Sequence, residues 1–239
     1  MCGRFTMVRL SDFTDMFPWI RPPEAGVPPR YNIAPGQPVA AALNLDPPRI
    51  ELVRWGLVPA WADDPTIGNR LINARAESLA HKPSFFAPLR RRRCIVPASG
   101  FYEWRREADG SKTPVYITAA SGKPLPFAGL WDVWCAPDGS ELRTCTIITV
   151  PASPLIRQVH NRMPAILPAE LCRKWLSAGE AAADDMKRVL KACAGDDLVL
   201  RPVSKLVNDP RNDVPQCIQP TGAVTGEDRN RRAPGLFDQ

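Results

Sequence analysis

The first five residues, Met1-Cys2-Gly3-Arg4-Phe5, place a cysteine where removal of the initiator methionine makes it the N-terminal residue. Cys2 then carries a free α-amine, with an ordinary pKa of about 7.7–8.0, and a thiol, with an ordinary pKa of about 8.5. Such a 1,2-aminothiol condenses with an aldehyde: the amine forms an imine, and the sulfur closes a five-membered thiazolidine ring. The second step is effectively unimolecular because both nucleophiles belong to one residue. Taken alone, a cysteine at position two does not establish this chemistry.

The chain has only two histidines, and they differ in their surroundings. His160 comes at the end of a predicted helix, next to Asn161 and Arg162 and four residues before a proline, so it is a candidate acid or base. His81 lies in an Ala-His-Lys-Pro context with no obvious partner nearby. We interpret His81 as a surface residue.

Glu103 lies among aromatic residues, in the predicted strand Gly100-Phe101-Tyr102-Glu103-Trp104. Burial there would raise the pKa of its carboxyl toward a value useful for general acid–base catalysis. The alternative is an outward-facing carboxylate on an exposed strand face. Asn73 and Arg75 alternate along the chain, which places them on one face of an extended segment.

Composition limits the class of protein. The 239 residues, of which 44% are hydrophobic and 23% charged, suffice for one large domain or two small ones. We find no apolar run long enough to span a bilayer and no signal peptide, so no membrane association is expected. The seven cysteines show no CxxC pairing, which argues against a zinc site or a disulfide framework and indicates the cytoplasm. A net charge of +6 is compatible with nucleic-acid binding without demonstrating it.

The predicted elements alternate between strands and short helices, separated by loops that contain many of the 27 prolines. Ser11 is predicted to cap a helix through Phe17, and Ser153 a helix that leads to His160. Segments 113–119, 126–134 and 141–150 resemble a meander. The other predicted strands are 2–9, 38–44, 49–55, 94–97, 100–104 and 197–204, and the other predicted helices are 75–89, 168–177 and 180–194. This pattern predicts a single α+β domain with a largely antiparallel sheet core, followed by a disordered tail.

Six ordered blocks of sequence resemble the SRAP family, the SOS response-associated peptidases or abasic-site processing proteins. They are Met1-Cys2-Gly3-Arg4-Phe5, Tyr31-Asn32-Ile33-Ala34-Pro35-Gly36, Trp55-Gly56-Leu57-Val58-Pro59-Ala60-Trp61, Asn73-Ala74-Arg75-Ala76-Glu77, Gly100-Phe101-Tyr102-Glu103-Trp104 and His160-Asn161-Arg162-Met163-Pro164. The similarity runs from residue 2 to about residue 209. It implies an SRAP domain over 1–220, with a barrel-like β core flanked by helices, and a tail over 221–239.

The resemblance implies a protein that binds an abasic site in single-stranded DNA and cross-links itself to the ring-opened sugar. We expect no metal or cofactor, and nothing in the sequence suggests more than a monomer. By position, Cys2 is the nucleophile, with its amine making the imine and its sulfur closing the ring. Asn73 orients the amine or the sugar, Glu103 shuttles protons, and His160 helps to open the deoxyribose ring. Glutamate and histidine are ordinary groups for such proton transfers.

The resemblance also implies a set of DNA contacts. Trp61 is expected to stack on a flanking base. Some relatives have a second aromatic residue next, where this chain has Ala62, so a two-residue wedge is in doubt. Trp55 is expected in the core. The expected phosphate or sugar contacts, and a residue beside the same groove, are Arg4, Arg75, Arg162 and Asn32.

Two other interpretations stay open. The run Arg90–Arg93 is either a backbone-binding stripe or a solvated face. A cysteine hydrolase would use Cys2 as thiolate, His160 as base and Glu103 to orient it, with activity that could be limited to removal of Met1. A noncatalytic single-strand binder would leave the position of Cys2 unexplained.

Overall fold

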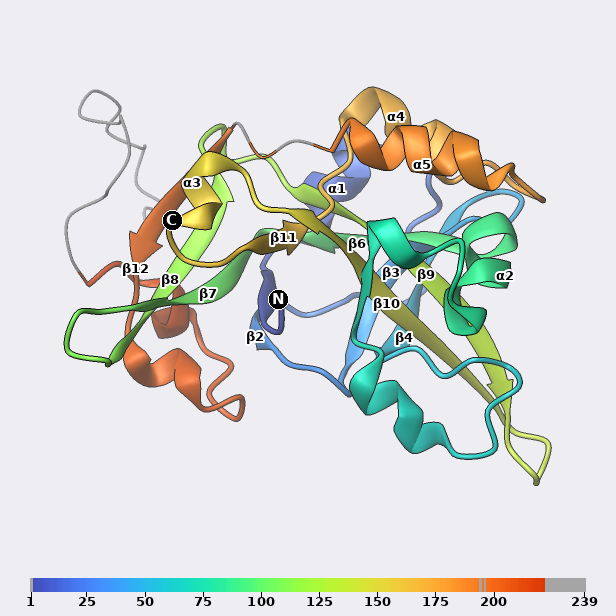
Figure 1. The fold of residues 1–239 in the computed structure, drawn as a ribbon, viewed down its shortest axis with the longest axis horizontal. Coiled ribbons are helices and arrows are strands. Elements are labelled where there is room, and N and C mark those ends of the chain that lie inside the picture. The colour runs from blue at the N-terminus through green and yellow to red at the C-terminus, as the bar shows by residue number, and fades with distance from the viewer. Residues whose placement is uncertain (1, 194, 196, 222–239) are drawn as a thin grey trace.

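The computed structural model describes residues 2–193, 195 and 197–221 (Figure 1). The tail predicted over 221–239 lies outside the described residues, apart from Thr221. Within the described part, no helix is long and apolar enough to cross a membrane.

Five strands form a closed barrel at the centre of the fold. Their order is β10-β4-β3-β6-β9, and β9 pairs with β10 to complete the circle. All of these pairs are antiparallel except β4 with β10. Two short strands extend the sheet along β10, β5 in parallel and β11 antiparallel. The strands are β3 (Pro38–Leu43), β4 (Arg49–Trp55), β5 (Asn73–Arg75), β6 (Arg93–Ala98), β9 (Leu125–Cys135), β10 (Glu141–Pro151) and β11 (Arg162–Pro164). This architecture confirms the predicted α+β domain with its largely antiparallel, barrel-like core.

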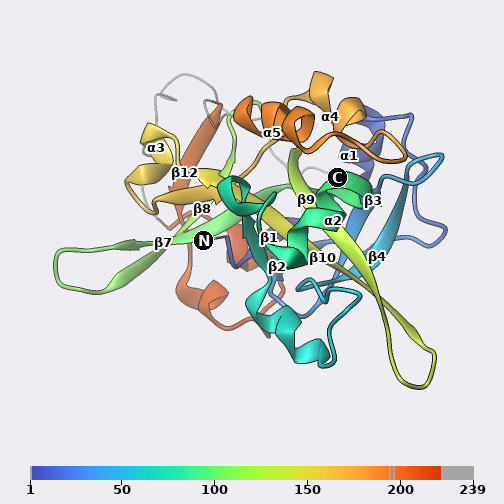
Figure 2. The ribbon, with the colours of Figure 1, turned by 45° about the vertical axis from the view of Figure 1, so that its right-hand side comes forward.

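A second sheet of five strands lies beside the barrel, in the order β12-β8-β7-β1-β2. Figure 2 shows the β7–β8 hairpin and the β9–β10 hairpin projecting from opposite sides of the molecule. The strands are β1 (Phe5–Met7), β2 (Arg30–Ile33), β7 (Gly100–Arg106), β8 (Lys112–Ala119) and β12 (Leu198–Pro202). The predicted meander is therefore wrong, because β8 pairs with β7 and β12 while β9 and β10 pair in the barrel. Both β8 and β9 are buried along most of their length, so their side-chain pattern does not identify their neighbours.

The helices are short and cover the barrel. In Figure 1, α4 and α5 lie together over one end of the molecule, and α2 packs against β9 and α5. The α-helices are α1 (Leu10–Met16), α2 (Pro83–Arg91), α3 (Pro154–Arg157), α4 (Ala169–Trp175) and α5 (Ala183–Lys191). Short 3₁₀ turns form η1 (Pro65–Arg70), η2 (Ala76–Ser78), η3 (Lys205–Asn208) and η4 (Pro215–Ile218).

Two helix boundaries differ from the prediction. The helix expected over 75–89 begins only at Pro83, because Arg75 is in strand β5 and Lys82 has the extended conformation typical of a residue before proline. Ser11 lies inside α1, whose N-cap position is occupied by Arg9. Ser153 does occupy the N-cap position of α3, although its side chain makes no capping hydrogen bond.

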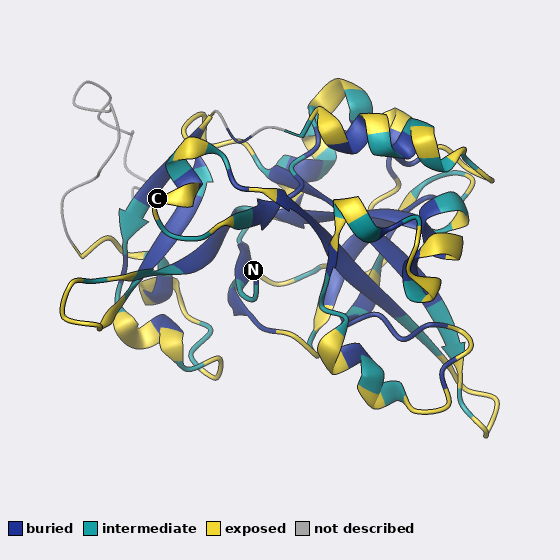
Figure 3. Ribbon diagram, in the orientation of Figure 1, coloured by how far each residue is buried: buried dark blue, intermediate teal, exposed yellow. Residues whose placement is uncertain are grey.

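The core fills the barrel and continues into the space between the two sheets, where the strands are mostly buried (Figure 3). Trp55 has no exposed surface, which confirms its predicted place in the core. Its indole N–H donates to the carbonyl oxygen of Ile72 at 2.9 Å, as a buried indole requires. This bond ties the end of β4 to the chain just before β5.

The arginine run at 90–93 is used within the fold. Arg90 and Arg91 both pair with Glu180, and Arg92 pairs with Asp132. Arg93 is fully buried. The first three arginines are therefore partly exposed but engaged in ion pairs, whereas Arg93 belongs to the core.

Candidate active site

Strand pairing brings Cys2 to the junction of the two sheets. β1 pairs with β7 through Phe5 and Phe101, and the N–H of Tyr102 donates to the carbonyl oxygen of Arg4 at 2.9 Å. Cys2, just before this pairing, is fully buried, and its carbonyl oxygen accepts a hydrogen bond from Nδ2 of Asn73 at 2.7 Å. Because Asn73 lies on β5 of the barrel sheet, this bond joins the N-terminal segment to both sheets.

Glu103 lies on β7 and is buried, so the alternative of an exposed, outward-facing carboxylate is wrong. Burial raises the pKa of its carboxyl, and the nearby His160 offsets part of that increase. Burial also raises the pKa of the Cys2 thiol, and the carboxylate of Glu103 raises it further. Glu103 therefore lies close enough to Cys2 to affect the pKa of the thiol, and close enough to His160 for the histidine to affect the pKa of the Glu103 carboxyl.

His160 follows α3 in a turn that leads into β11. Its Nδ1 accepts a hydrogen bond from the backbone N–H of Arg162 at 2.9 Å. Nδ1 also lies 3.2 Å from the carbonyl oxygen of Arg162, and the tautomer of the ring decides whether Nδ1 donates there or accepts from the N–H. Both contacts are with Arg162, so they give the His160 ring a defined orientation in the cavity wall.

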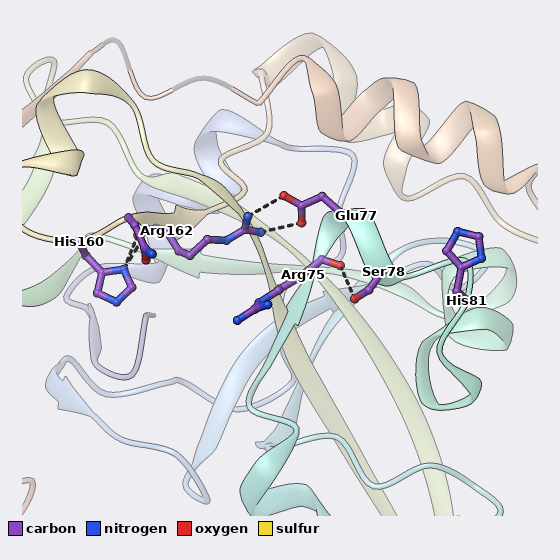
Figure 4. A pocket seen from close by; sticks show the side chains of 7 residues that line it. Arg75, Glu77, Ser78, His81, His160 and Arg162 are labelled. Carbon is purple, nitrogen blue, oxygen red and sulfur yellow. Dashed lines mark hydrogen bonds and ion pairs between the residues drawn. The ribbon is translucent and has the colours of Figure 1, made fainter.

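A cavity of about 720 Å³ opens beside these groups (Figure 4). Its wall is rich in basic side chains, and Figure 4 shows Arg75 extending into the space between His160 and His81. The side chain of Arg75 makes no hydrogen bond or ion pair with any residue of the described part. The lining residues are Arg75, Glu77, Ser78, His81, His160, Asn161 and Arg162.

Arg162 is held firmly in the cavity wall. Its Nη1 and Nη2 donate to the two carboxylate oxygens of Glu77 at 2.6 and 2.9 Å, and Nη2 also donates to the carbonyl oxygen of Thr149 at 2.5 Å. The bond to Arg162 lowers the pKa of the Glu77 carboxyl, although burial acts against it. A bidentate arrangement of this kind matches the planar guanidinium to a carboxylate, and a phosphate fits it equally well.

Arg4 is anchored on another side of the N-terminal segment. Its Nη1 donates to Oδ1 of Asn32 and to the carbonyl oxygen of Val207, both at 2.8 Å, and its guanidinium lies 5.8 Å from the ring centroid of Trp104. The Nδ2 of Asn32 is directed to the carbonyls of Val207, Asp209 and Asn212.

Asn32, which was expected beside the DNA groove, contacts only protein groups in the described part of this structure. Asn32 is fully buried, and both polar atoms of its amide have protein partners. Its side chain orients Arg4 and holds the segment after β12 in place through hydrogen bonds to backbone carbonyls. No sequence pattern indicates this role, because the partners are backbone carbonyls about 175 residues away.

Trp61 lies in the loop between β4 and η1, and 59% of its surface is exposed. Neighbouring bonds hold the loop: the N–H of Ala60 donates to Asp132 at 3.2 Å, and the indole of Trp134 donates to the carbonyl oxygen of Ala62 at 2.7 Å. Ala62 itself is nearly buried, so Trp61 is presented alone. Neither Trp61 nor Arg4 lines the cavity beside His160.

The structure thus brings together Cys2, Asn73, Glu103 and His160, with Arg75 and Arg162 in the adjoining cavity. Sequence reasoning missed Glu77 and Ser78, which follow Arg75 directly, and His81, which is exposed as expected but lines the cavity. In the described part, no group of three or more His, Cys, Asp or Glu side chains is arranged to hold a metal ion, and all seven cysteines are free.

Comparisons with solved structures identify the same fold in other proteins. A protein from Bacteroides thetaiotaomicron superimposes with a TM-score of 0.81 at 26% identity, over 92% of this chain and 99% of the other. A protein from Bordetella bronchiseptica superimposes with a TM-score of 0.72 at 28% identity, over 85% of this chain and the whole of the other.

Sequence comparisons are more specific. The abasic site processing protein YoqW of Bacillus subtilis (strain 168) is 42% identical over 224 residues, which are 92% of this chain and 99% of that protein. The abasic site processing protein HMCES of Gallus gallus is 36% identical over 192 residues, or 70% of this chain and 56% of that protein. The family model described as SOS response associated peptidase (SRAP) matches residues 1–210. The chain therefore belongs to the SRAP family.

Proposed function

We propose that this chain binds single-stranded DNA at an abasic site and links itself covalently to the ring-opened sugar through Cys2, once Met1 has been removed. The observation that carries the proposal is the convergence of Cys2 with Asn73, Glu103 and His160 beside a cavity lined by arginines. The names of relatives such as YoqW, an abasic site processing protein at 42% identity, support the choice of substrate.

The first step of the proposed reaction opens the sugar. An abasic deoxyribose is mostly a closed hemiacetal. Opening it to the aldehyde breaks the bond between C1′ and the ring oxygen, so the ring oxygen gains a proton and the anomeric hydroxyl loses one. His160 is suited to this proton transfer because contacts with the backbone of Arg162 hold its ring in the cavity wall, and an imidazolium is an ordinary general acid.

In the second step, the amine of Cys2 attacks the aldehyde carbon, C1′. A C1′=N bond forms, and the former aldehyde oxygen leaves as water. Glu103 is suited to supply the proton for this departure because burial keeps its carboxyl protonated to higher pH than an exposed glutamate. The hydrogen bond from Asn73 to the carbonyl oxygen of Cys2 fixes the residue that bears the amine.

In the third step, the sulfur of Cys2 adds to the imine carbon. An S–C1′ bond forms, the imine electron pair returns to nitrogen, and the thiol proton ends on that nitrogen. The product is a five-membered thiazolidine, and one water has been lost overall.

The state of the thiol favours this amine-first route over the cysteine hydrolase. A hydrolase needs a thiolate, which proteins obtain by lowering the thiol pKa with a nearby cation or a helix N-terminus. Here burial and Glu103 both raise the pKa of the Cys2 thiol. Ring closure tolerates a neutral thiol, because the imine carbon is activated and the sulfur belongs to the same residue.

The proposed DNA contacts divide into phosphate binding and base stacking. Arg75 offers an uncommitted guanidinium in the cavity, and Arg162 offers one that is shared with Glu77. Trp61 presents an exposed ring that can stack on a flanking base, which is worth about 1–3 kcal/mol. Arg4 is proposed as a contact near the N-terminal segment, with Asn32 holding it in place.

The test compares wild-type protein with the Cys2→Ser variant on a single-stranded oligonucleotide that carries one aldehydic abasic site. Wild-type protein is expected to give a cross-link that survives heating without borohydride. The serine variant retains the amine and can form an imine, but it lacks the sulfur, so its adduct should be lost on heating. An equally heat-stable adduct from the variant contradicts the thiazolidine.

A further inference from the structure

A second cavity, of about 490 Å³, lies directly beside the one that holds His160. It is enclosed by η2, the end of β10 and helix α5, which Figure 1 shows above the barrel. The two cavities share Glu77 in their walls. A ligand strand that fills the first cavity can therefore continue into the second.

The floor of this second cavity is apolar and its rim is basic. Apolar surface comes from Ala76, Val150 and Leu190. Lys187 and Lys191 are four residues apart on α5, so their side chains lie on one face of the helix. The one acidic residue of the wall, Glu77, has its charge balanced by Arg162. Lys187 pairs with Asp184, outside the lining, at 3.1 Å, so among the described lining residues Lys191 is the rim cation without an ion pair.

We propose that this second cavity is a subsite for a nucleotide next to the abasic position. The flat base lies on the apolar floor, and the phosphate is directed to Lys187 and Lys191. The volume is within the range of about 300–1,000 Å³ that small-molecule sites occupy. This inference rests on the proposed function and adds to it a place for the strand beyond the lesion.

Lys191 and Arg188 provide a matched pair of variants for the test. Both belong to α5 and each carries one positive charge, but Lys191 lines the cavity, whereas Arg188 is 74% exposed and pairs with Asp185. The probe is a single-stranded oligonucleotide with a tetrahydrofuran abasic analogue, which cannot cross-link. Lys191→Ala should reduce the magnitude of the salt slope of binding by about 0.7, and Arg188→Ala should leave it unchanged. Equal slopes for the two variants overturn the subsite.

Length dependence gives a second measurement. Oligonucleotides of increasing length, extended on one side of the analogue at a time, should distinguish Lys191→Ala from wild type only once the added nucleotides on one side reach the cavity. A defect that is the same for every length and both sides contradicts a localised subsite.

Cys193 reports on the apolar part of the cavity, since it is half-buried in the lining. Bound oligonucleotide should slow its alkylation by iodoacetamide several-fold, measured by mass spectrometry over hours, while the exposed Cys135 serves as the control. Unchanged alkylation of Cys193 at saturating oligonucleotide overturns the subsite. If wild-type protein still cross-links aldehydic abasic DNA, only the subsite has failed, whereas absence of any cross-link refutes the proposed function itself.

Discussion

Replacing Arg93 by methionine should be one of the most destabilising single changes in the chain. The guanidinium of Arg93 is fully buried and has no carboxylate partner among the described residues. Its donors go instead to backbone carbonyls at the ends of two helices: Nη1 to Arg90 at 2.5 Å, Nε to Trp175 at 2.8 Å and Nη2 to Ser177 at 2.6 Å. These carbonyls carry the partial negative charge of a helix C-terminus, which a buried cation complements.

The magnitude follows from the bonds that are lost. Arg93→Met leaves the buried carbonyl of Trp175 and the partly buried carbonyls of Arg90 and Ser177 without this donor, at about 1–3 kcal/mol for each buried group. Water can reach the two partly buried carbonyls, so the free energy of unfolding should fall by about 2–4 kcal/mol. Arg91→Met is the matched control, because Arg91 is 69% exposed and only pairs with Glu180. That variant should lose at most about 1 kcal/mol.

The measurement is urea denaturation of both variants and of Arg93→Lys, which keeps the charge but reaches fewer carbonyls. The free energy of unfolding of Arg93→Lys should lie between those of wild type and Arg93→Met. If Arg93→Met fails to fold, Arg93→Lys takes its place in the comparison. If Arg93→Met and Arg91→Met have the same midpoint, the buried bonds of Arg93 contribute nothing to stability, and the reasoning is refuted.

Three further predictions concern the proposed site. Arg75→Ala should weaken binding of single-stranded DNA and reduce the magnitude of its salt slope by about 0.7. Arg106→Ala, on an exposed hairpin, is the control and should leave both unchanged. If the Arg75→Ala slope equals that of wild type, Arg75 is not a phosphate contact. Glu77→Gln should tighten DNA binding up to about fivefold, because the ion pair of Glu77 with Arg162, worth about 0.2–1 kcal/mol, no longer competes with the DNA phosphate. Weaker DNA binding by this variant in an anisotropy titration would contradict the competition between Glu77 and phosphate. The raised pKa of Glu103 means that the folded protein keeps this proton at pH values where the unfolded chain has released it. The free energy of unfolding of the wild type should therefore fall as pH rises above 4.5, the ordinary pKa of a glutamate, and through the raised pKa of the folded state. Denaturation at a series of pH values should show that Glu103→Gln removes this dependence, and a parallel decline in the variant shows that another group is responsible.

Much of the local structure was readable from the sequence. Strands predicted over 38–44 and 49–55 match β3 and β4 closely, because alternating apolar residues and turn signals are local. Pairing between distant strands was not readable. The parallel pairing of Thr144 with Arg54, for example, joins segments 90 residues apart.

The candidate site was predicted from residue types and the family resemblance, and its geometry depends on that distant pairing. Glu103 and Asn73 belong to different sheets, and Cys2 meets both because β1 pairs with β7 while β5 pairs with β10. The buried roles of Asn32 and Arg93 could not be predicted from the sequence. A buried amide and a buried guanidinium that bond to backbone carbonyls look the same in sequence as exposed polar residues.

The central claim is that Cys2 forms a thiazolidine with abasic DNA, and intact mass tests it most directly. Purified protein is incubated with a single-stranded oligonucleotide carrying one aldehydic abasic site and is then denatured without borohydride. The products are separated on a gel, and their intact masses are measured by mass spectrometry. We predict a single adduct whose mass equals the protein without Met1 plus the oligonucleotide minus one water. No adduct from protein that demonstrably lacks Met1, or an adduct on protein that retains it, would contradict the account.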